Sequence, residues 1–262
     1  MIKQFIKNRK GQKVCVLVEG VENKSGLAFV MHGLGGFKGQ PHIKAAAEAF
    51  LENGYITVRF DTTNTFGESD GKYEDATTTN YYEDLEDVIE WSGTQNWYKE
   101  PFIVCGHSLG GISTALYAQK HPEKVKALIP ISPVVSGKLS TETEHFKEIR
   151  AEWERTGWRE EESVSLPGVI KRLPWSHVVD RLKYDLIPLA GKLTMPVLII
   201  VGDKDTTTPL AHQKILFKAL PGEKEIAVIK GATHSFRKEI DISQLKNAIS
   251  DWLRKLDAGK SL

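Results

Sequence analysis

The sequence predicts an α/β fold, in which helices cover both faces of a mostly parallel central sheet. Short apolar runs typical of buried strands alternate along the chain with longer amphipathic segments typical of helices. No internal repeat interrupts this alternation. Because such sheets bind their ligands at the carboxyl ends of the strands, function is expected in the loops that follow the strands.

The expected elements follow one another in order along the 262 residues. Strands are expected at 2–7 and 13–19, which form a hairpin, and at 26–31, 55–60, 102–105, 126–132, 196–201 and 225–229. Helices are expected at 41–53, 80–92, 109–121, 209–219 and 241–256. Pro41 near the first position and Gly54 after the last turn mark the ends of the first helix. Glu83 and Asp84, expected in the first turn of the second helix, favour its N-terminus there.

The alternation stops after residue 132, and the next 59 or so residues have no strong strand signal. The apolar strand pattern resumes near residue 196. We therefore expect residues 1–132 and 192–262 to form the core domain. Residues 133–191 are expected to form an inserted cap, or lid, over the site.

One helix is expected within this insertion, in the segment TETEHFKEIRAEWER. Thr141 and Glu144 have the spacing of a capping box at its start. Phe146, Ile149 and Trp153 form an apolar stripe along it. We interpret this stripe as a surface that packs on the body of the protein; a wall for the substrate is the alternative.

The composition is that of an ordinary soluble protein, with 40% hydrophobic and 26% charged residues. A formal net charge of +1 without like-charged blocks gives no reason to expect nucleic acid or an anionic membrane as a partner. The N-terminus resembles no secretory signal and no apolar run could span a bilayer, so a cytoplasmic location is expected. Cys15 and Cys105 are expected to be buried thiols, with a disulfide between them as the alternative. The histidines lack metal-ligand spacing, so neither a metal nor another cofactor is expected.

The strongest motif lies in the stretch PFIVCGHSLGGISTALYAQKH, residues 101–121. A strand-like run crosses Gly106-His107-Ser108-Leu109-Gly110 and enters a helix, which is the G-x-S-x-G pattern of a nucleophile elbow. Side chains in place of the two glycines would collide with so tight a turn. The serine then lies at a helix N-terminus, where free backbone N–H groups can hold an anion. A serine N-cap followed by helix-packing glycines is the alternative interpretation of this stretch alone.

Three more loops at strand ends carry chemically suggestive residues: the glycine-rich turn 32–36, the acids Asp203 and Asp205, and His234. A serine attacks well only when a base takes its proton, and an imidazole can take that proton and return it to the leaving group. A carboxylate can orient the imidazole and stabilise its charged form. These loops together therefore offer the parts of a nucleophilic serine site.

With these motifs in order, nearly the whole chain resembles an α/β-hydrolase. HGLGG resembles the family's oxyanion loop, GHSLGG its elbow, PVLIIVGDKDTTTP its acid loop and GATHSF its histidine loop. Within the superfamily the chain is most similar to small serine carboxylesterases of the feruloyl/cinnamoyl-esterase and monoacylglycerol-lipase-like groups. It departs from the pattern after Asp61, where Thr63 stands in place of a usual arginine, so the contacts of that loop are not carried over.

The resemblance implies a serine esterase that cleaves carboxylic esters through an acyl-enzyme, with a small-molecule ester as its partner. The residues that it assigns are Ser108 as nucleophile, His234 as base and Asp205 as acid, with the backbone N–H groups of Leu34 and Leu109 as the oxyanion hole. An amidase or aminopeptidase on the same fold is the nearest alternative. A non-catalytic, ligand-binding protein on this scaffold is the alternative from another class.

Several neighbouring residues have a structural interpretation. Asp203 is the rival of Asp205, and either acid could instead cap the turn before Pro209. His107, directly before the serine, is expected to point away from the site and to be structural. His32 is expected to stabilise its loop through hydrogen bonds and not to act as a second base.

Overall fold

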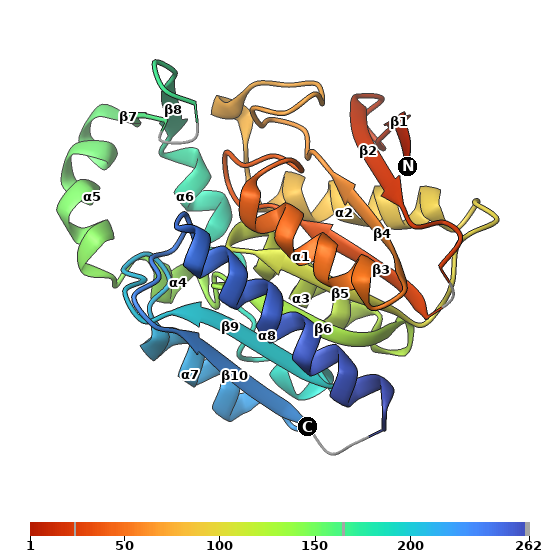
Figure 1. Ribbon diagram of the computed structural model, residues 1–262. Coiled ribbons are helices and arrows are strands. Elements are labelled where there is room, and N and C mark those ends of the chain that lie inside the picture. Colours follow the sequence, from red (N-terminus) through yellow and green to blue (C-terminus); the bar gives the residue numbers. More distant parts are fainter. Residues whose placement is uncertain (24, 164–165, 260–262) are drawn as a thin grey trace.

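The protein is built around one eight-stranded sheet with the order β1-β2-β4-β3-β5-β6-β9-β10, and helices lie on both of its faces (Figure 1). This computed structural model describes residues 1–23, 25–163 and 166–259. β1 and β2 form an antiparallel hairpin, β2 pairs antiparallel with β4, and the remaining pairs are parallel. The sheet strands are β1 (Ile2–Lys7), β2 (Lys13–Glu19), β3 (Gly26–Met31), β4 (Tyr55–Phe60), β5 (Phe102–His107), β6 (Val125–Ile131), β9 (Val197–Gly202) and β10 (Lys224–Ile229). The predicted fold class is confirmed.

The helices form two layers. α1 and α8 cover one face of the sheet, and α2, α3 and α7 cover the other. The helices are α1 (Pro41–Glu52), α2 (Thr78–Ser92), α3 (Leu109–Lys120), α4 (Gly137–Ser140), α5 (Glu144–Thr156), α6 (Ser176–Arg181), α7 (Leu210–Ala219) and α8 (Glu239–Asp257), with 3₁₀ turns at Tyr73–Asp75, Pro122–Lys124 and Ala190–Lys192.

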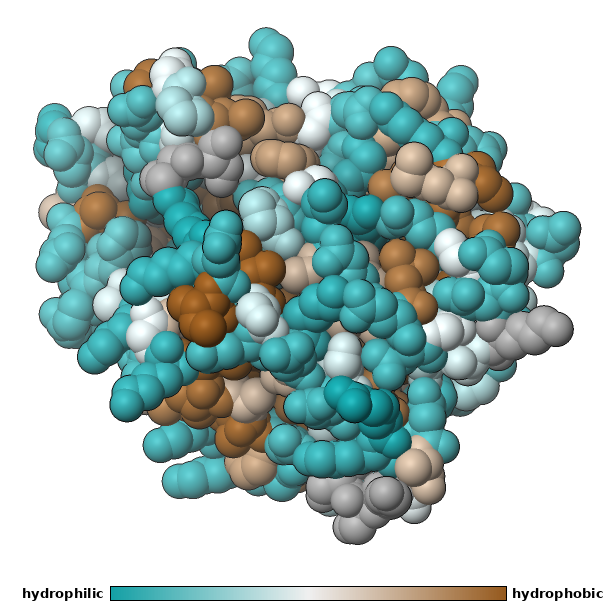
Figure 2. Space-filling view, in the orientation of Figure 1, coloured by the Kyte–Doolittle hydropathy of each residue, from teal (hydrophilic) through white to brown (hydrophobic). Residues whose placement is uncertain are grey.

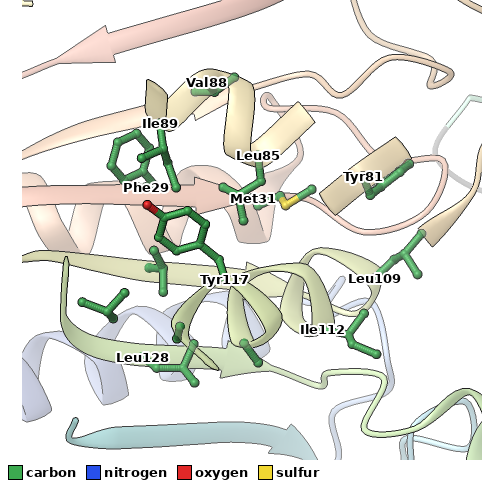
Figure 3. Close-up of a cluster of buried hydrophobic side chains, with 14 of the residues drawn as sticks. Phe29, Met31, Tyr81, Leu85, Val88, Ile89, Leu109, Ile112, Tyr117 and Leu128 are labelled. Carbon is green, nitrogen blue, oxygen red and sulfur yellow. The ribbon is translucent and has the colours of Figure 1, made fainter. Parts of the chain in front are cut away.

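The central strands are buried on both sides, which is why their sequences are almost continuously apolar. Side chains alternate across the sheet, so Phe29 and Met31 of β3 pack toward α2 and α3, whereas Val30 packs in the opposite layer. Figure 3 shows the first of these clusters. Full burial of a side chain such as Phe29 contributes about 1.5–3 kcal/mol. Tight packing on both faces fixes the ends of the strands, from which the site is built.

Both cysteines lie in this buried sheet. Cys15 and Cys105 are free thiols, so the disulfide alternative is wrong. Burial raises the pKa of both thiols, although Lys38 partly opposes this at Cys15. The face of the molecule in Figure 2 is mostly hydrophilic, with hydrophobic residues in small groups. Within the described ranges, no helix combines the length and apolar character needed to cross a bilayer.

A second, two-stranded sheet lies in the segment where no strong strand signal was found. β7 (Trp158–Glu162) and β8 (Ile170–Pro174) form an antiparallel hairpin beyond α5. The hairpin is largely exposed, so cross-strand ion pairs such as Arg172–Glu160, with 2.6 Å between Nε and Oε1, replace apolar contacts. The apolar pattern used to predict strands is absent from such a sequence.

The starts of α2 and α5 differ from the prediction for reasons that their caps explain. α2 begins at Thr78 because the Thr77 hydroxyl accepts a hydrogen bond from Asn80 N at 3.0 Å, which places no acid in its first turn. α5 is capped by Thr143, whose hydroxyl accepts from Phe146 N at 3.2 Å. The predicted capping box at Thr141 is therefore wrong. Thr141 instead ends α4.

Candidate active site

Ser108 lies at the tip of the turn between β5 and α3, in a conformation that few residues adopt. Its φ is 54° and its ψ is −112°. The turn is too tight for side chains beside it: a Cβ on Gly106 would lie 2.3 Å from the Gly110 carbonyl O, and a Cβ on Gly110 would lie 2.4 Å from the His32 carbonyl O. These contacts explain the two glycines of the G-x-S-x-G pattern.

The structure brings together the three residues that the sequence singled out after β5, β9 and β10. His234 Nε2 is 2.9 Å from Ser108 Oγ, and His234 Nδ1 is 2.8 Å from Asp205 Oδ2. With Asp205 accepting from Nδ1–H, Nε2 is left as the acceptor for the serine hydroxyl proton. The arrangement can therefore withdraw a proton from Ser108.

Asp205 is held as a buried carboxylate. Its Oδ1 accepts from the N–H groups of Thr207 and Thr208 at 2.9 and 2.8 Å, and the Thr208 hydroxyl donates to Oδ2 at 3.0 Å. Burial alone would raise the pKa of Asp205, but the hydrogen bond and charge of His234 and the Thr208 amide hold it well below the usual range. The acid is therefore ionised at neutral pH and able to orient the imidazole.

Asp203, the rival acid, has a different role. It lies on the exposed side of the same turn, where Oδ1 accepts a hydrogen bond from Gly231 N at 2.6 Å. This bond ties the loop after β9 to the loop after β10. Asp203 thus stabilises the backbone of the loop that carries His234, whereas Asp205 forms a hydrogen bond with the imidazole of His234 itself.

His107 takes part in the site in a way that the sequence did not indicate. Its ring lines the cavity beside Ser108, although the prediction had it pointing away. His107 Nε2–H donates to the backbone carbonyl of His234 at 2.8 Å. Burial lowers the pKa of His107 well below its ordinary value, so the ring is neutral. The residue next to the candidate nucleophile thus positions the backbone of the candidate base, which fits its predicted structural character.

His32 anchors the glycine-rich turn, as predicted. Its Nδ1–H donates to the Gly33 carbonyl at 2.8 Å, and its Nε2 accepts from Thr62 N at 3.1 Å. Within the turn, Gly35 N–H donates to the Tyr81 hydroxyl at 3.2 Å. Leu34 lines the cavity between these anchored positions. Leu109 opens α3 directly after Ser108, in the first turn of a helix, where backbone N–H groups lack an intrahelical acceptor.

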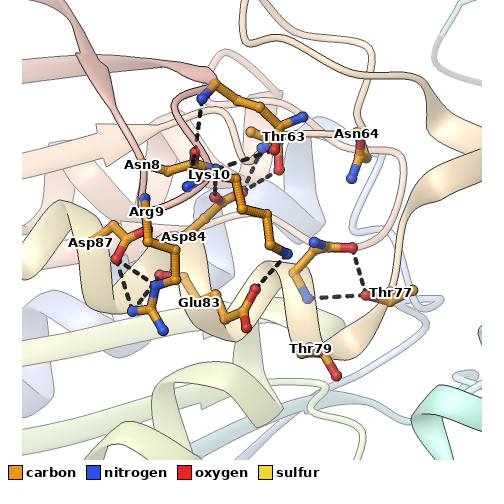
Figure 4. A network of polar contacts seen from close by, with 12 residues as sticks. Asn8, Arg9, Lys10, Thr63, Asn64, Thr77, Thr79, Glu83, Asp84 and Asp87 are labelled. Carbon is orange, nitrogen blue, oxygen red and sulfur yellow. Dashed lines mark hydrogen bonds and ion pairs between the residues drawn. The ribbon is translucent and has the colours of Figure 1, made fainter.

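The loop after β4, which departs from the expected family pattern at Thr63, is held in place by hydrogen bonds and an ion pair. Asp84 of α2 accepts from Thr63 N at 2.6 Å and from the Thr63 hydroxyl at 2.7 Å, and Figure 4 shows this pair within a larger polar network. Asp61 accepts from both the backbone N and the Nζ of Lys38, each at 2.6 Å. Thr63 thus anchors the loop to α2.

Cys15, Asp61 and Glu68 bring three ligand-type atoms within 4.8 Å of one another. Lys38 Nζ lies among them, 2.6 Å from Asp61 Oδ2 and 2.7 Å from Glu68 Oε1. The Lys38 ammonium thus supplies the positive charge between these carboxylates, and we interpret the cluster as an ion-pair network and not as a metal site.

The stripe on α5 packs within the inserted segment. Phe146 and Trp153 are buried and contact Trp175, with ring centroids 6.3 and 5.7 Å away. Trp153 Nε1–H donates to the Leu173 carbonyl at 3.0 Å. Neither Phe146, Ile149 nor Trp153 lines the cavity at Ser108. These contacts thus lie within the segment from 133 to 191, and not on the body of the protein as predicted; the stripe does pack against protein and does not form the wall of this cavity.

The sheet order, the elbow and the serine–histidine–aspartate chain of hydrogen bonds define the architecture of an α/β hydrolase. Solved structures share the fold along almost the full length. Est1E from Butyrivibrio proteoclasticus, solved with ferulic acid bound, has a TM-score of 0.80, is 24% identical, and the match covers 97% of this chain and 99% of that one. Mouse alpha/beta hydrolase domain-containing protein 10 has a TM-score of 0.78 at 23% identity, covering 98% and 100%.

The family model described as Hydrolase_4, serine aminopeptidase S33, matches residues 22–161, and the chain belongs to this family. The mitochondrial palmitoyl-protein thioesterase ABHD10 of Mus musculus is 27% identical over 240 residues, covering 88% of this chain and 76% of the relative. The thermostable monoacylglycerol lipase of Bacillus sp. strain H-257 is 25% identical over 209 residues, covering 76% and 80%. The chain is therefore a hydrolase with esterase, thioesterase and lipase relatives. Its cytoplasmic location remains a prediction, since one relative is named as mitochondrial.

Proposed function

We propose that this protein is a serine esterase, which hydrolyses carboxylic esters of small molecules through an acyl-enzyme. Ser108 is the nucleophile, His234 the general base and acid, and Asp205 the residue that orients His234. The observation that carries the proposal is the continuous chain of hydrogen bonds from Ser108 Oγ through His234 to Asp205, at 2.9 and 2.8 Å.

In the first step Ser108 Oγ attacks the acyl carbon while its proton moves to His234 Nε2. The carbonyl oxygen becomes an oxyanion, which the N–H groups of Leu34 and Leu109 stabilise. His234 then gives the proton to the departing alcohol, and the C–O bond of the ester breaks. Water enters, loses a proton to His234 and attacks the acyl-enzyme, which releases the acid and restores Ser108.

The oxyanion assignment is supported by the shape of the two turns. Gly33 packs against the nucleophile, because a Cβ there would lie 2.9 Å from Ser108 Cβ. Gly36 N–H donates back to the Gly33 carbonyl at 2.9 Å, which fixes the turn around Leu34. A fixed donor is worth about 3 kcal/mol to the barrier, because no reorganisation is needed as the charge develops.

The bond that is cleaved has two alternatives within the same mechanism. The family description names a serine aminopeptidase, which favours an amide. The thioesterase named among the relatives favours an acyl thioester. We place the oxygen ester first because the sequence resembles the small carboxylesterases. A ligand-binding protein without turnover is less well supported, since the hydrogen-bonded chain from serine to acid is complete.

The test compares 4-nitrophenyl esters of short and medium acyl chains, an aryl ester such as a ferulate, an acyl thioester and an aminoacyl anilide. We expect a burst of nitrophenol followed by steady turnover of the oxygen esters. Ser108→Ala should lower kcat by more than 10³-fold, since the nucleophile is lost. Ser113→Ala is the matched control: this α3 serine is buried, and its hydroxyl donates to the Leu109 carbonyl at 2.8 Å away from the hydrogen-bonded triad. A Ser108→Ala rate within twofold of the unmodified enzyme would refute the mechanism.

A further inference from the structure

The cavity beside Ser108 and His234 has a volume of about 320 Å³ and a wall that carries positive charge. Two of its lining residues, Lys171 and Arg237, are cationic. No aspartate or glutamate is among the described residues that line it. A substrate in this cavity therefore meets cations without a lining carboxylate.

Lys171 is already committed to an ion pair. Its Nζ lies 2.5 Å from Glu161 Oε1 across the β7–β8 hairpin, and Glu161 also pairs with Arg159. One carboxylate thus serves two cations, and Lys171 remains part of the framework of the hairpin. The Lys171 ammonium adds positive potential to the cavity, but its ion pair with Glu161 keeps it from moving to bind a ligand.

Arg237 differs from Lys171 in having no such partner. It follows His234 by three residues in the loop before α8, and its guanidinium forms no hydrogen bond or ion pair with another described residue. Its charge nevertheless acts on the cavity wall. Burial, together with smaller contributions from nearby charges that include Arg237, lowers the pKa of His42 to about 3. A planar guanidinium with five donors is well suited to carboxylate or phosphate oxygens.

The N-terminus of α1 adds to the positive electrostatic potential at the wall of the cavity. Pro41 and His42, its first two residues, line the cavity. The first turn contains no acidic residue, and the side chain of its N-cap residue, Gln40, makes no capping hydrogen bond to it. The positive end of the helix dipole is thus uncompensated at the wall, which favours a nearby anion. The helix end and Arg237 are independent features that act in the same direction.

We propose that Arg237 binds an anionic group of the substrate, a carboxylate or a phosphate, so that the enzyme prefers negatively charged esters to neutral ones. This rests on the proposed esterase function, because it assigns the substrate class of that same site. The charge can belong to the acyl part or to the alcohol part of the ester. The chemistry of recognition is the same in both cases.

The experiment uses pairs of esters that differ only in charge. In the acyl arm, the 4-nitrophenyl monoester of adipic acid is compared with the 4-nitrophenyl ester of its neutral monoamide. In the leaving-group arm, 4-acetoxybenzoate is compared with 4-acetoxybenzamide. Nonenzymatic hydrolysis is subtracted in each case. We expect kcat/KM to favour the anionic member up to about fivefold in at least one arm, as a charge-assisted hydrogen bond from an exposed arginine implies.

Variants separate recognition from catalysis. Arg237→Gln should remove the preference by lowering kcat/KM for the anionic ester up to about fivefold, with less than a twofold change for its neutral partner. Arg237→Lys should keep part of the preference, since the charge remains but the planar fork is lost. Lys238→Gln is the matched control, because it removes the same charge at the next residue, which does not line the cavity. Raising the salt concentration to 0.5 M should reduce the preference of the unmodified enzyme, since exposed charges are screened.

The outcomes distinguish this inference from the proposed function. Equal kcat/KM values for anionic and neutral esters in both arms would overturn the role of Arg237 while leaving the esterase intact. An equal loss for both members in Arg237→Gln would also overturn it, since that pattern indicates a general structural effect. The neutral esters report on the esterase itself: their Ser108-dependent turnover supports the proposed function whatever happens at Arg237.

Discussion

The assignment of the acid makes the sharpest quantitative prediction. Asp205→Asn changes one oxygen into an NH₂ group in a site where the side chain has no exposed surface. The amide oxygen can still accept from Thr207 N and Thr208 N, so the turn should keep its shape. The NH₂ group, however, would donate to His234 Nδ1, where the carboxylate accepted. His234 would then carry its proton on Nε2, facing Ser108 with a donor in place of an acceptor.

The size of the effect follows from two losses. A hydrogen bond between charged partners is worth about 1.5–3 kcal/mol, and the substitution removes it from the imidazolium that forms during attack. The wrong tautomer adds a further cost, and the same substitution lowers kcat by about 10⁴ in serine proteases. We therefore expect kcat to fall by about 10²–10⁴, which corresponds to about 3–5 kcal/mol in the barrier. KM should change little, because Asp205 does not line the cavity.

Steady-state kinetics on a nitrophenyl ester measure this loss, with Asp203→Asn as the matched control. An asparagine at position 203 can still accept from Gly231 N through its amide oxygen, so we expect its kcat within threefold of the unmodified enzyme. Thermal unfolding should show that both variants are folded. Equal losses of kcat in the two variants, with both folded, would refute the assignment of Asp205.

Two further predictions concern stability. Thr63→Val should lower the free energy of unfolding by about 1–3 kcal/mol, because it removes a donor from the buried Asp84 carboxylate. Thr57→Val should be neutral or stabilising, since the buried Thr57 hydroxyl has no partner among the described residues, and urea unfolding compares the two. Burial lowers the pKa of His177 to about 4 and that of His42 to about 3, so the unfolded chain binds more protons below pH 6.5. The contribution of these neutral histidines to stability should therefore be fully present above pH 6.5. Below that, the free energy of unfolding should fall by about 1.4 kcal/mol per pH unit and per histidine toward pH 4.5. A flat profile over this range would contradict the burial of the two histidines as neutral rings.

Much of the fold and of the candidate site could be predicted because a parallel sheet obeys simple rules. All eight strands of the central sheet were predicted, and the apolar runs located the central ones, since strands buried on both faces have little other choice of residue. Ser108, Asp205 and His234 each follow such a strand, and the carboxyl ends of parallel strands share one edge. Their positions after these strands, together with the resemblance to α/β-hydrolases that selected Asp205 over Asp203, led us to expect their convergence, and the geometry agrees.

What the sequence could not supply depends on contacts between distant segments. His107 could be placed beside Ser108, but its hydrogen bond to the backbone of His234, 127 residues away, follows from the packing of two loops. Asp84 was expected to favour a helix N-terminus, yet it is buried and binds Thr63. The cavity position of Arg237 has the same origin, since nothing in the local sequence separates it from an ordinary surface arginine.

The pairing of α1 with α8 has a consequence for how the protein is made. The two helices pack in one layer, yet they come from opposite ends of the chain, and Tyr55 and Asp257, whose side chains lie 2.7 Å apart, are separated by 202 residues. At about 5–20 residues per second, a ribosome needs roughly 10–40 s to cover that distance. Throughout that interval the apolar flank that Trp252 and Leu253 will later cover is exposed on the nascent chain. The layer that α1 and α8 form can therefore be completed only after α8 has left the exit tunnel.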